Sequence, residues 1–405
     1  MERKIAWEKY SQEEMDKVFT FAEDYRQFLS HGKTERECVK LAVAEAKAHG
    51  YEDLNDVIAA GKTLKAGDKV YSVCMGKTLA MFQIGEEPLE NGMNIVGAHI
   101  DSPRIDLKQN PLYEDNDMAM FDTHYYGGIK KYQWVALPLA LYGVVAKKDG
   151  TTVDIAIGDD HGDPVFGISD LLPHLAREQM AKTAAKIIEG EDLNLLIGSI
   201  PVKGEEKEAV KKNILAILKE KYDIEEDDFI SAELEVVPAG AARDYGFDRS
   251  MIMGYGHDDR VCAYPSYKAM FELGSVKRTA VCLLVDKEEI GSVGATGMTS
   301  FYFENTVAEV INACGDYSDI KVRRALNNSR MLSSDVSAGF DPNYPSVMEK
   351  NNSAFLGKGL TFNKYTGSGG KSGSNDANAE YVALVRKIMD DADVTWQTAE
   401  LGKVD

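Results

Sequence analysis

Strand-like segments that alternate with helical ones constrain the fold of this chain more than any other feature. After residue 245, a helical pattern begins near residue 258, TAVCLLVD reads as a buried strand, and TVAEVINACG has helical spacing. Further strands are expected in MLSSDVS, NSAFLGKGLTF and VTWQT. A helix is expected in NDANAEYVALVRKIMDDA, with Asn375 or Asp376 as its cap. This alternation predicts an α/β fold with a mixed central sheet flanked by helices.

The region between residues 109 and 243 has a different texture. Aromatic and turn residues dominate 110–134, and VALPLALYGVVA and TTVDIAIG read as a hairpin. A helix is expected around 174–188, and SAELEVVPA alternates like a strand. We therefore expect an α/β domain made of 1–108 and 244–405, interrupted by a domain inserted over 109–243.

Composition and charge exclude several classes of protein. The 405 residues are 44% hydrophobic and 28% charged, as in ordinary soluble globular proteins. The formal net charge of -20 argues against a nucleic-acid partner, because phosphate binding needs clustered Lys and Arg. The five cysteines lie outside CxxC pairs, which indicates a reducing compartment. Without a signal peptide or a membrane-length apolar run, we expect a cytoplasmic protein with no membrane partner.

Acidic side chains and one histidine gather where predicted strands end or helices begin. They are His99 and Asp101 after NIVGA, Glu288 and Glu289 after CLLVDK, Asp335 in MLSSD, and Asp258 in GYGHDD. Ligands of open α/β sheets bind beyond the carboxyl ends of the strands, so these side chains should lie together. A lone aspartate at such a position is more often a cap or turn residue. Converging carboxylates repel one another, however, unless a cation holds them, which favours a metal site.

The residue types in this cluster indicate which metal ions it would bind. One imidazole and several carboxylates, without cysteine, suit Zn, Mn or Co in a catalytic site better than a structural zinc site. A bridging carboxylate with flanking His and carboxylate ligands is typical of hydrolases with two divalent metal ions. Such an enzyme also needs a carboxylate that is not a ligand, as general base. Two adjacent glutamates can supply both roles, one as ligand and one facing the water.

The sequence resembles the aspartyl aminopeptidase family, part of the co-catalytic zinc metallo-aminopeptidase clan, over nearly the whole chain. The segments that carry the resemblance are VGAHIDSPRIDLK (96–108), GYGHDDRVCAY (254–264), LLVDKEEIGSVGATG (283–297), LSSDVSAGFDPNY (332–344) and GSGGKSGSNDA (367–377). The resemblance implies an α/β metallopeptidase domain with an inserted, β-rich dimerisation domain. It also implies peptide substrates that lose N-terminal, typically acidic, residues, and assembly into a tetrahedral homododecamer.

The same motifs imply a role for each residue of the cluster. The implied metal ligands are His99, Asp258, which bridges the two ions, and Glu289 and Asp335, which bind one ion each. Asp101 would stand behind the ring of His99 and fix it, and Glu288 would be the general base on the metal-bound water.

Two further residues are candidates for contact with substrate. In this family a histidine from the inserted domain of a neighbouring subunit can reach the active site, and His174 in LLPHLAREQ stands at the matching position. The competing interpretation of His174 is a residue at a helix start. Lys371 in GSGGKSGSNDA would pair with an acidic N-terminal side chain, against the alternative of a solvated loop lysine.

Two departures from the family pattern leave alternatives open. The family's last metal ligand is a histidine near the C-terminus, and none follows His257 here, so we expect the natural protein to extend beyond Asp405. Many members also carry histidines near the PNY segment, where this chain has Asp341 and Met348. A related two-metal deblocking peptidase or deacylase, and a non-catalytic homologue without the last ligand, are therefore kept beside the aminopeptidase.

Overall fold

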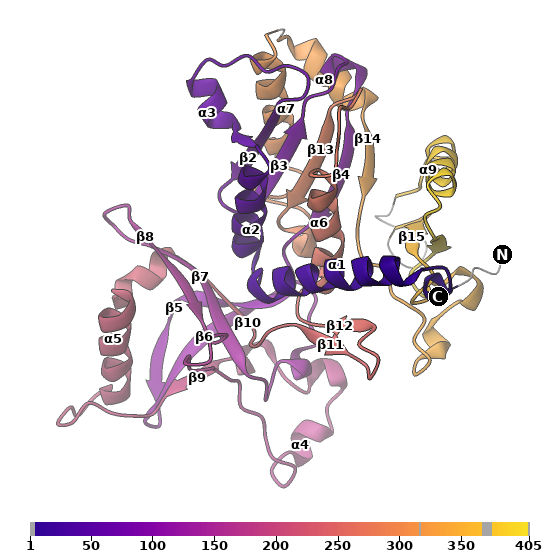
Figure 1. Ribbon diagram of the computed structural model, residues 1–405. Coiled ribbons are helices and arrows are strands. Elements are labelled where there is room, and N and C mark those ends of the chain that lie inside the picture. The colour runs from indigo at the N-terminus through magenta and orange to yellow at the C-terminus, as the bar shows by residue number, and fades with distance from the viewer. Residues whose placement is uncertain (1–4, 316, 367–374, 404–405) are drawn as a thin grey trace. The chain divides into compact units, whose positions relative to one another are not determined.

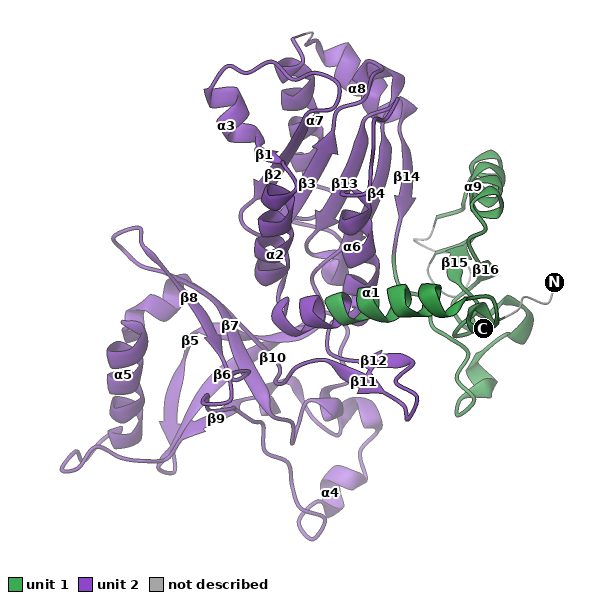
Figure 2. Ribbon diagram, viewed as in Figure 1, with its two compact units in different colours: residues 1–24, 335–405 green, residues 25–334 purple. Residues whose placement is uncertain are grey.

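The chain forms two compact units. The computed structural model describes residues 5–315, 317–366 and 375–403 (Figure 1). The larger unit is Tyr25–Ser334, and the smaller one combines Met1–Asp24 with Asp335–Asp405 (Figure 2). These units do not coincide with the domains expected from the sequence, 1–108 with 244–405 and 109–243, and those domains stay a prediction.

A mixed sheet organises the larger unit. Within the described residues its six strands are, in spatial order, β1 (Glu52–Asp53), β2 (Lys69–Cys74), β3 (Thr78–Gln83), β13 (Ala280–Val285), β4 (Asn94–His99) and β14 (Arg330–Ser333). β4 runs parallel to both of its neighbours, whereas β3 runs antiparallel to β13 and β2. The mixed central sheet flanked by helices is thus confirmed.

Helices cover both faces of this sheet (Figure 1). One face packs against α2 (Glu35–Ala48), α6 (His257–Ala269) and the end of α1 (Gln12–His31). The other packs against α3 (Leu54–Ala59), α7 (Tyr302–Ala313) and α8 (Asp319–Asn328). Successive residues of β3 alternate between the two cores, because side chains along a strand point to opposite faces: Leu79 and Met81 lie in one, Ala80 and Phe82 in the other.

A second, antiparallel sheet follows in the same unit. Within the described residues its strands are, in spatial order, β8 (Thr152–Ile157), β7 (Leu139–Ala146), β10 (Ala232–Pro238), β5 (Arg104–Asp115), β6 (Met118–Tyr126) and β9 (Leu195–Gly198). The expected hairpin is β7 with β8. Helix α5 (Ala209–Tyr222) packs Ile214 and Leu218 on the core of this sheet. A short pair, β11 (Arg243–Tyr245) with β12 (Met251–Met253), leads back to α6.

The helix expected around 174–188 is wrong in extent. The structure has α4 (Arg177–Met180) and a separate 3-10 turn, Ala184–Lys186, in this segment. Leu175 and Met180 are largely exposed, whereas Ile187 and Ile188 pack into the core of the second sheet. Most helical stability in proteins comes from packing an apolar face, and here the residues of the first half of the segment are mostly exposed.

The smaller unit contains helix α9 (Ala379–Asp391) and the parallel pair β15 (Leu360–Asn363) and β16 (Trp396–Ala399). The expected cap of α9 is wrong by two to three residues, because the Oδ1 atom of Asn378 accepts the amide hydrogen of Tyr381. Asn375 instead donates its backbone N–H to Thr366, which holds this stretch in an extended bridge.

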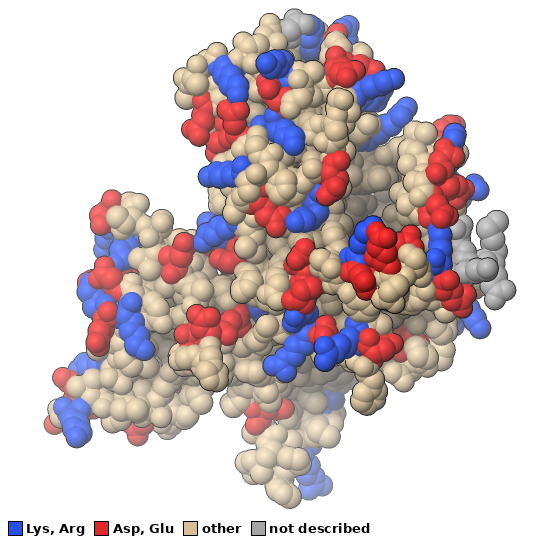
Figure 3. All heavy atoms as spheres, in the orientation of Figure 1, with Lys and Arg blue, Asp and Glu red and all other residues tan. Residues whose placement is uncertain are grey.

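The surface carries charges of both signs. Figure 3 shows Lys and Arg interspersed with Asp and Glu on the viewed face rather than gathered into a basic patch. Among the described residues, no helix combines the length and the hydropathy that crossing a bilayer requires.

Candidate metal centre

The carboxyl ends of β4 and β13 lie side by side, because the two strands are parallel neighbours. Val285, the last residue of β13, pairs with His99, the last residue of β4. The chain then turns sharply through Lys287, whose φ is 68°, into a single 3-10 turn that carries Glu288 and Glu289. Strand pairing therefore brings both glutamates to the edge where His99 ends its strand.

His99 stands at the centre of the cluster. Its Nε2 atom lies 3.1 Å from Oδ1 of Asp258 and 3.7 Å from Oε2 of Glu288. One potential ligand atom each from His99, Asp258 and Glu289 lies within 4.8 Å of the others. The imidazole is buried, whereas the Asp258 side chain is 50% exposed, so the group is open on its carboxylate side.

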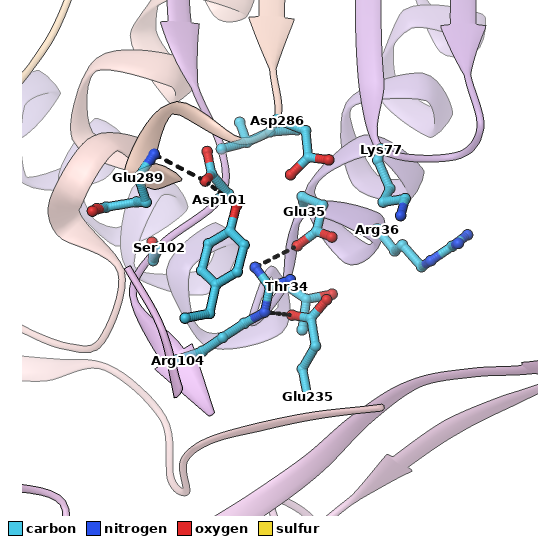
Figure 4. A network of polar contacts seen from close by, with 12 residues as sticks. Thr34, Glu35, Arg36, Lys77, Asp101, Ser102, Arg104, Glu235, Asp286 and Glu289 are labelled. Carbon is cyan, nitrogen blue, oxygen red and sulfur yellow. Dashed lines mark hydrogen bonds and ion pairs between the residues drawn. The ribbon is translucent and has the colours of Figure 1, made fainter. Parts of the chain in front are cut away.

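Asp101 supports this arrangement from behind. Its side chain is fully buried, and its Oδ1 atom lies 3.2 Å from Nδ1 of His99. The backbone N–H of Glu288 donates to Oδ1 over 3.1 Å. That of Glu289 donates to Oδ2 over 3.2 Å, as Figure 4 shows. A third bond, over 2.8 Å, comes from the hydroxyl of Tyr126 to Oδ2. One carboxylate thus holds both the histidine ring and the turn with the two glutamates.

The charges of the cluster favour a cation. Burial raises the pKa of Glu289, and Asp258 raises it further, to about 7. Burial lowers the pKa of His99, but its hydrogen bonds to Asp101 and Asp258 outweigh that effect and raise the pKa to about 11. A proton or a divalent metal ion relieves the repulsion among such carboxylates. An imidazole nitrogen with carboxylate oxygens is also a donor set that zinc accepts, so these residues fit a zinc ion.

Asp258 is positioned by the start of α6. The hydroxyl of Ser102 donates to the main-chain oxygen of Asp258 over 2.5 Å, which ties this helix start to the segment after β4. The peptide bond between Asp258 and Asp259 is cis. Behind it, the side chain of Arg260 is buried and donates to the carbonyl oxygen of Ile100 over 3.2 Å.

The roles of the other three expected site residues stay predictions. Asp335 follows β14 by two residues and belongs to the smaller unit, so its role as a ligand stays a prediction. His174 is exposed in the turn before α4, and its predicted contact needs a neighbouring subunit. Lys371 falls outside the described residues.

Sequence reasoning missed three residues near the cluster: Tyr126, which donates to Asp101, Arg104, which stacks on Tyr126, and Ser102, which donates to Asp258. The alternation along β6 buries Ala119, Phe121 and Thr123 and would place Tyr125 inside as well. Instead Tyr125 is 42% exposed and Tyr126 only 9%. The local pattern therefore contains no signal for Tyr126, although the adjoining glycines Gly127 and Gly128 mark a place where the strand ends.

Comparison with known proteins identifies the family. Residues 28–405 match the model of the family described as aminopeptidase I zinc metalloprotease (M18). A probable M18 family aminopeptidase 1 of Clostridium acetobutylicum is 64% identical over 405 residues, which are 100% of this chain and 87% of that protein. The crystal structure of aminopeptidase I from the same organism superposes with a TM-score of 0.92 at 62% identity, covering 100% of this chain and 88% of that one. An M18 aminopeptidase from Thermotoga maritima superposes with a TM-score of 0.94 at 44% identity and the same coverage. The chain belongs to the M18 family of zinc metallopeptidases, and it is a metallo-aminopeptidase.

Proposed function

We propose that this enzyme releases N-terminal residues from peptides at a centre that binds two zinc ions, with a preference for acidic residues. The observation that carries this proposal is the convergence of His99, Asp258 and Glu289, whose donor atoms lie within 4.8 Å of one another at the carboxyl ends of parallel strands. Ligand sites of α/β sheets are found at such edges. The high identity to M18 aminopeptidases supports the same reaction class.

His99, Glu289 and Asp335 would each bind one ion, and Asp258 would bridge the two. Zinc in such a site supplies Lewis-acid chemistry, which polarises the scissile carbonyl and acidifies a water molecule. His99 must present a neutral Nε2 atom to the metal. Its Nδ1 atom faces both the main-chain oxygen and the carboxylate of Asp101, at 2.9 and 3.2 Å, and these acceptors keep the proton on Nδ1.

Glu288 would act as the general base. Its side chain is 45% exposed, so water and substrate can reach it, and its backbone is held by Asp101. The carboxylate would accept a proton from the attacking water and return it to the leaving amine as the peptide bond breaks. This division of labour explains why two glutamates stand side by side in the same turn.

The test is a substrate profile of the zinc-loaded enzyme. We expect short peptides that begin with Asp or Glu to be hydrolysed faster than matched peptides that begin with Asn, Gln or Leu. Chelation should abolish turnover of all of them. Equal rates for all free N-termini would remove the acidic preference, and activity confined to blocked N-termini would favour a deblocking peptidase.

We also propose that the chain self-associates as a homododecamer in a cytoplasmic, reducing compartment. Support for assembly comes from large apolar side chains exposed on the second sheet and its loops: Val165, Leu171, Leu172, Leu175, Met180 and Ile200. His174 lies in this stretch, where it would reach a neighbour's site. None of the five cysteines, all of which are described, forms a disulfide, which supports a reducing compartment. Sedimentation velocity measures the assembly directly, and a monomer at micromolar concentration would contradict it.

A further inference from the structure

Tyr126, a residue of the second sheet, contacts the carboxylate that supports the candidate metal centre. Tyr126 is the last residue of β6, and its hydroxyl donates to Oδ2 of Asp101 over 2.8 Å. Its ring lies against Arg104, whose guanidinium carbon is 3.8 Å from the ring centroid. A guanidinium stacked on an aromatic ring fixes the plane of that ring, and the interaction strengthens where both groups are desolvated.

Arg104 is itself held by carboxylates from several elements. Its Nε atom lies 2.8 Å from Oδ1 of Asp106 and 3.2 Å from Oε2 of Glu235 on β10, and its Nη1 atom lies 3.6 Å from Oε2 of Glu35 on α2. Figure 4 shows Arg104 between Glu35 and Glu235. Arg104, Glu35 and Glu235 are buried, so the guanidinium has little freedom to turn.

The bonds to Asp101 show what the tyrosine does. Within the described residues, the donors to its carboxylate are the backbone N–H groups of Glu288 and Glu289, Nδ1 of His99 and the hydroxyl of Tyr126. Two carboxylate oxygens offer about four acceptor sites, and these donors fill them. Without the hydroxyl, Oδ2 would keep only the bond from Glu289, and the carboxylate could rotate. Both His99 and the turn with the glutamates would then lose their common support.

We propose that Tyr126, aligned by Arg104, is a positioning residue for the metal centre. It fixes the carboxylate of Asp101 and, through it, the ring of His99 and the backbone of Glu288 and Glu289. This inference rests on the proposed function, because it assigns Tyr126 a task at the proposed metal site.

The test compares Tyr126→Phe with Tyr125→Phe. The first removes only the hydroxyl on Asp101, and the second removes one from an exposed neighbour on the same strand. Zinc affinity is measured by chelator competition, together with kcat, KM and the melting temperature of the metal-free protein. For Tyr126→Phe we expect about 10-fold weaker zinc binding or a similar loss of kcat, with KM little changed. Tyr125→Phe should match the wild type in every measurement.

A double-mutant cycle shows whether Tyr126 acts through Asp101. In an Asp101→Asn background, Tyr126→Phe should cause little further loss of zinc affinity. Wild-type zinc affinity and kcat in Tyr126→Phe would overturn the proposal, and so would an undiminished loss in the Asp101→Asn background. A loss of melting temperature in Tyr126→Phe without weaker zinc binding or lower kcat would also overturn it, since that pattern belongs to a structural role.

These outcomes are distinct from failure of the proposed function. If the wild-type enzyme bound no zinc, the metal site itself would be wrong and the positioning role would fall with it. If the wild type bound zinc and Tyr126→Phe bound it equally well, only the positioning role would be wrong.

Discussion

At the scale of single residues, side-chain burial distinguishes the two adjacent glutamates, whereas their backbones are held alike. Both backbone amides donate to Asp101, so both residues are fixed. The Glu288 side chain is 45% exposed. Glu289 is half-buried beside Asp258, which together with burial raises its pKa to about 7. A carboxylate with an elevated pKa beside another carboxylate gains most from a metal ion, which is why we assign the ligand role to Glu289.

Replacing Glu288 with Gln should lower kcat by about 10²–10⁴-fold while zinc stays bound. The amide keeps the size of the side chain but cannot accept a proton from water. Turnover of a peptide substrate and zinc content by atomic absorption are the two measurements.

The matched control is Glu289→Gln, the same change in the neighbouring residue. We expect this variant to lose zinc affinity, because a neutral amide is a weaker ligand than a carboxylate. If Glu288→Gln lost zinc and Glu289→Gln retained it, the two roles would be exchanged.

At the scale of elements, the entry into β4 is determined by a close approach of two backbones. Gly92 has φ 99° and ψ 159°, a conformation that is essentially restricted to glycine. A Cβ atom at this position would lie 2.1 Å from the carbonyl oxygen of Asn328, the last residue of α8. Only glycine lets the chain pass this helix end and begin β4 in the register that carries His99 to the edge.

Gly92→Ala should therefore lower the free energy of unfolding more than Gly61→Ala. Gly61 also has a positive φ, of 61°, but its Cβ would meet no atom within 4 Å. The control should lose about 1–2 kcal/mol from backbone strain alone. Gly92→Ala should lose a further 1–3 kcal/mol, roughly the cost of overpacking. Urea denaturation of the metal-free proteins measures both, and equal losses would show that the clash relaxes freely.

At the scale of the whole molecule, the proposed metal ligands of the larger unit come from distant parts of the chain. His99 ends β4, Asp258 lies in the first turn of α6, and Glu289 follows β13. An ion bound to all three joins segments that the unfolded chain leaves separate. Metal binding and folding of the larger unit should therefore be coupled.

For each ion bound, zinc at 100 times its dissociation constant should raise the free energy of unfolding by about 2.7 kcal/mol relative to the chelated protein. Thermal or urea unfolding with and without zinc measures this difference. In His99→Ala the difference should fall, because one of the two proposed ions loses its imidazole ligand, whatever the stability of that variant in chelator. A full zinc effect in His99→Ala would place the ion elsewhere.

Most elements around the sheet were predictable, because each has a local signature. TAVCLLVD contains β13, and TVAEVINACG forms α7 from Thr306 to its end at Ala313. The failures have physical causes too: the first half of the 174–188 segment has helical spacing but leaves Leu175 and Met180 exposed, and Asn378 caps α9 because a bridge holds the preceding residues extended. The length of a helix and the position of its cap depend on neighbouring elements that the local sequence does not contain.

The sequence by itself determined which residues could form a metal centre. Apolar strands that end in His99 and in the glutamate pair, and a helix that starts at Asp258, required those side chains to meet once the strands paired in parallel. Only the tertiary structure decided how they are held. Tyr126 comes from another sheet and breaks the alternation of its own strand, and Arg104 is oriented by carboxylates on three elements. Support of this kind depends on the placement of whole elements, and short-range periodicity carries no information about it.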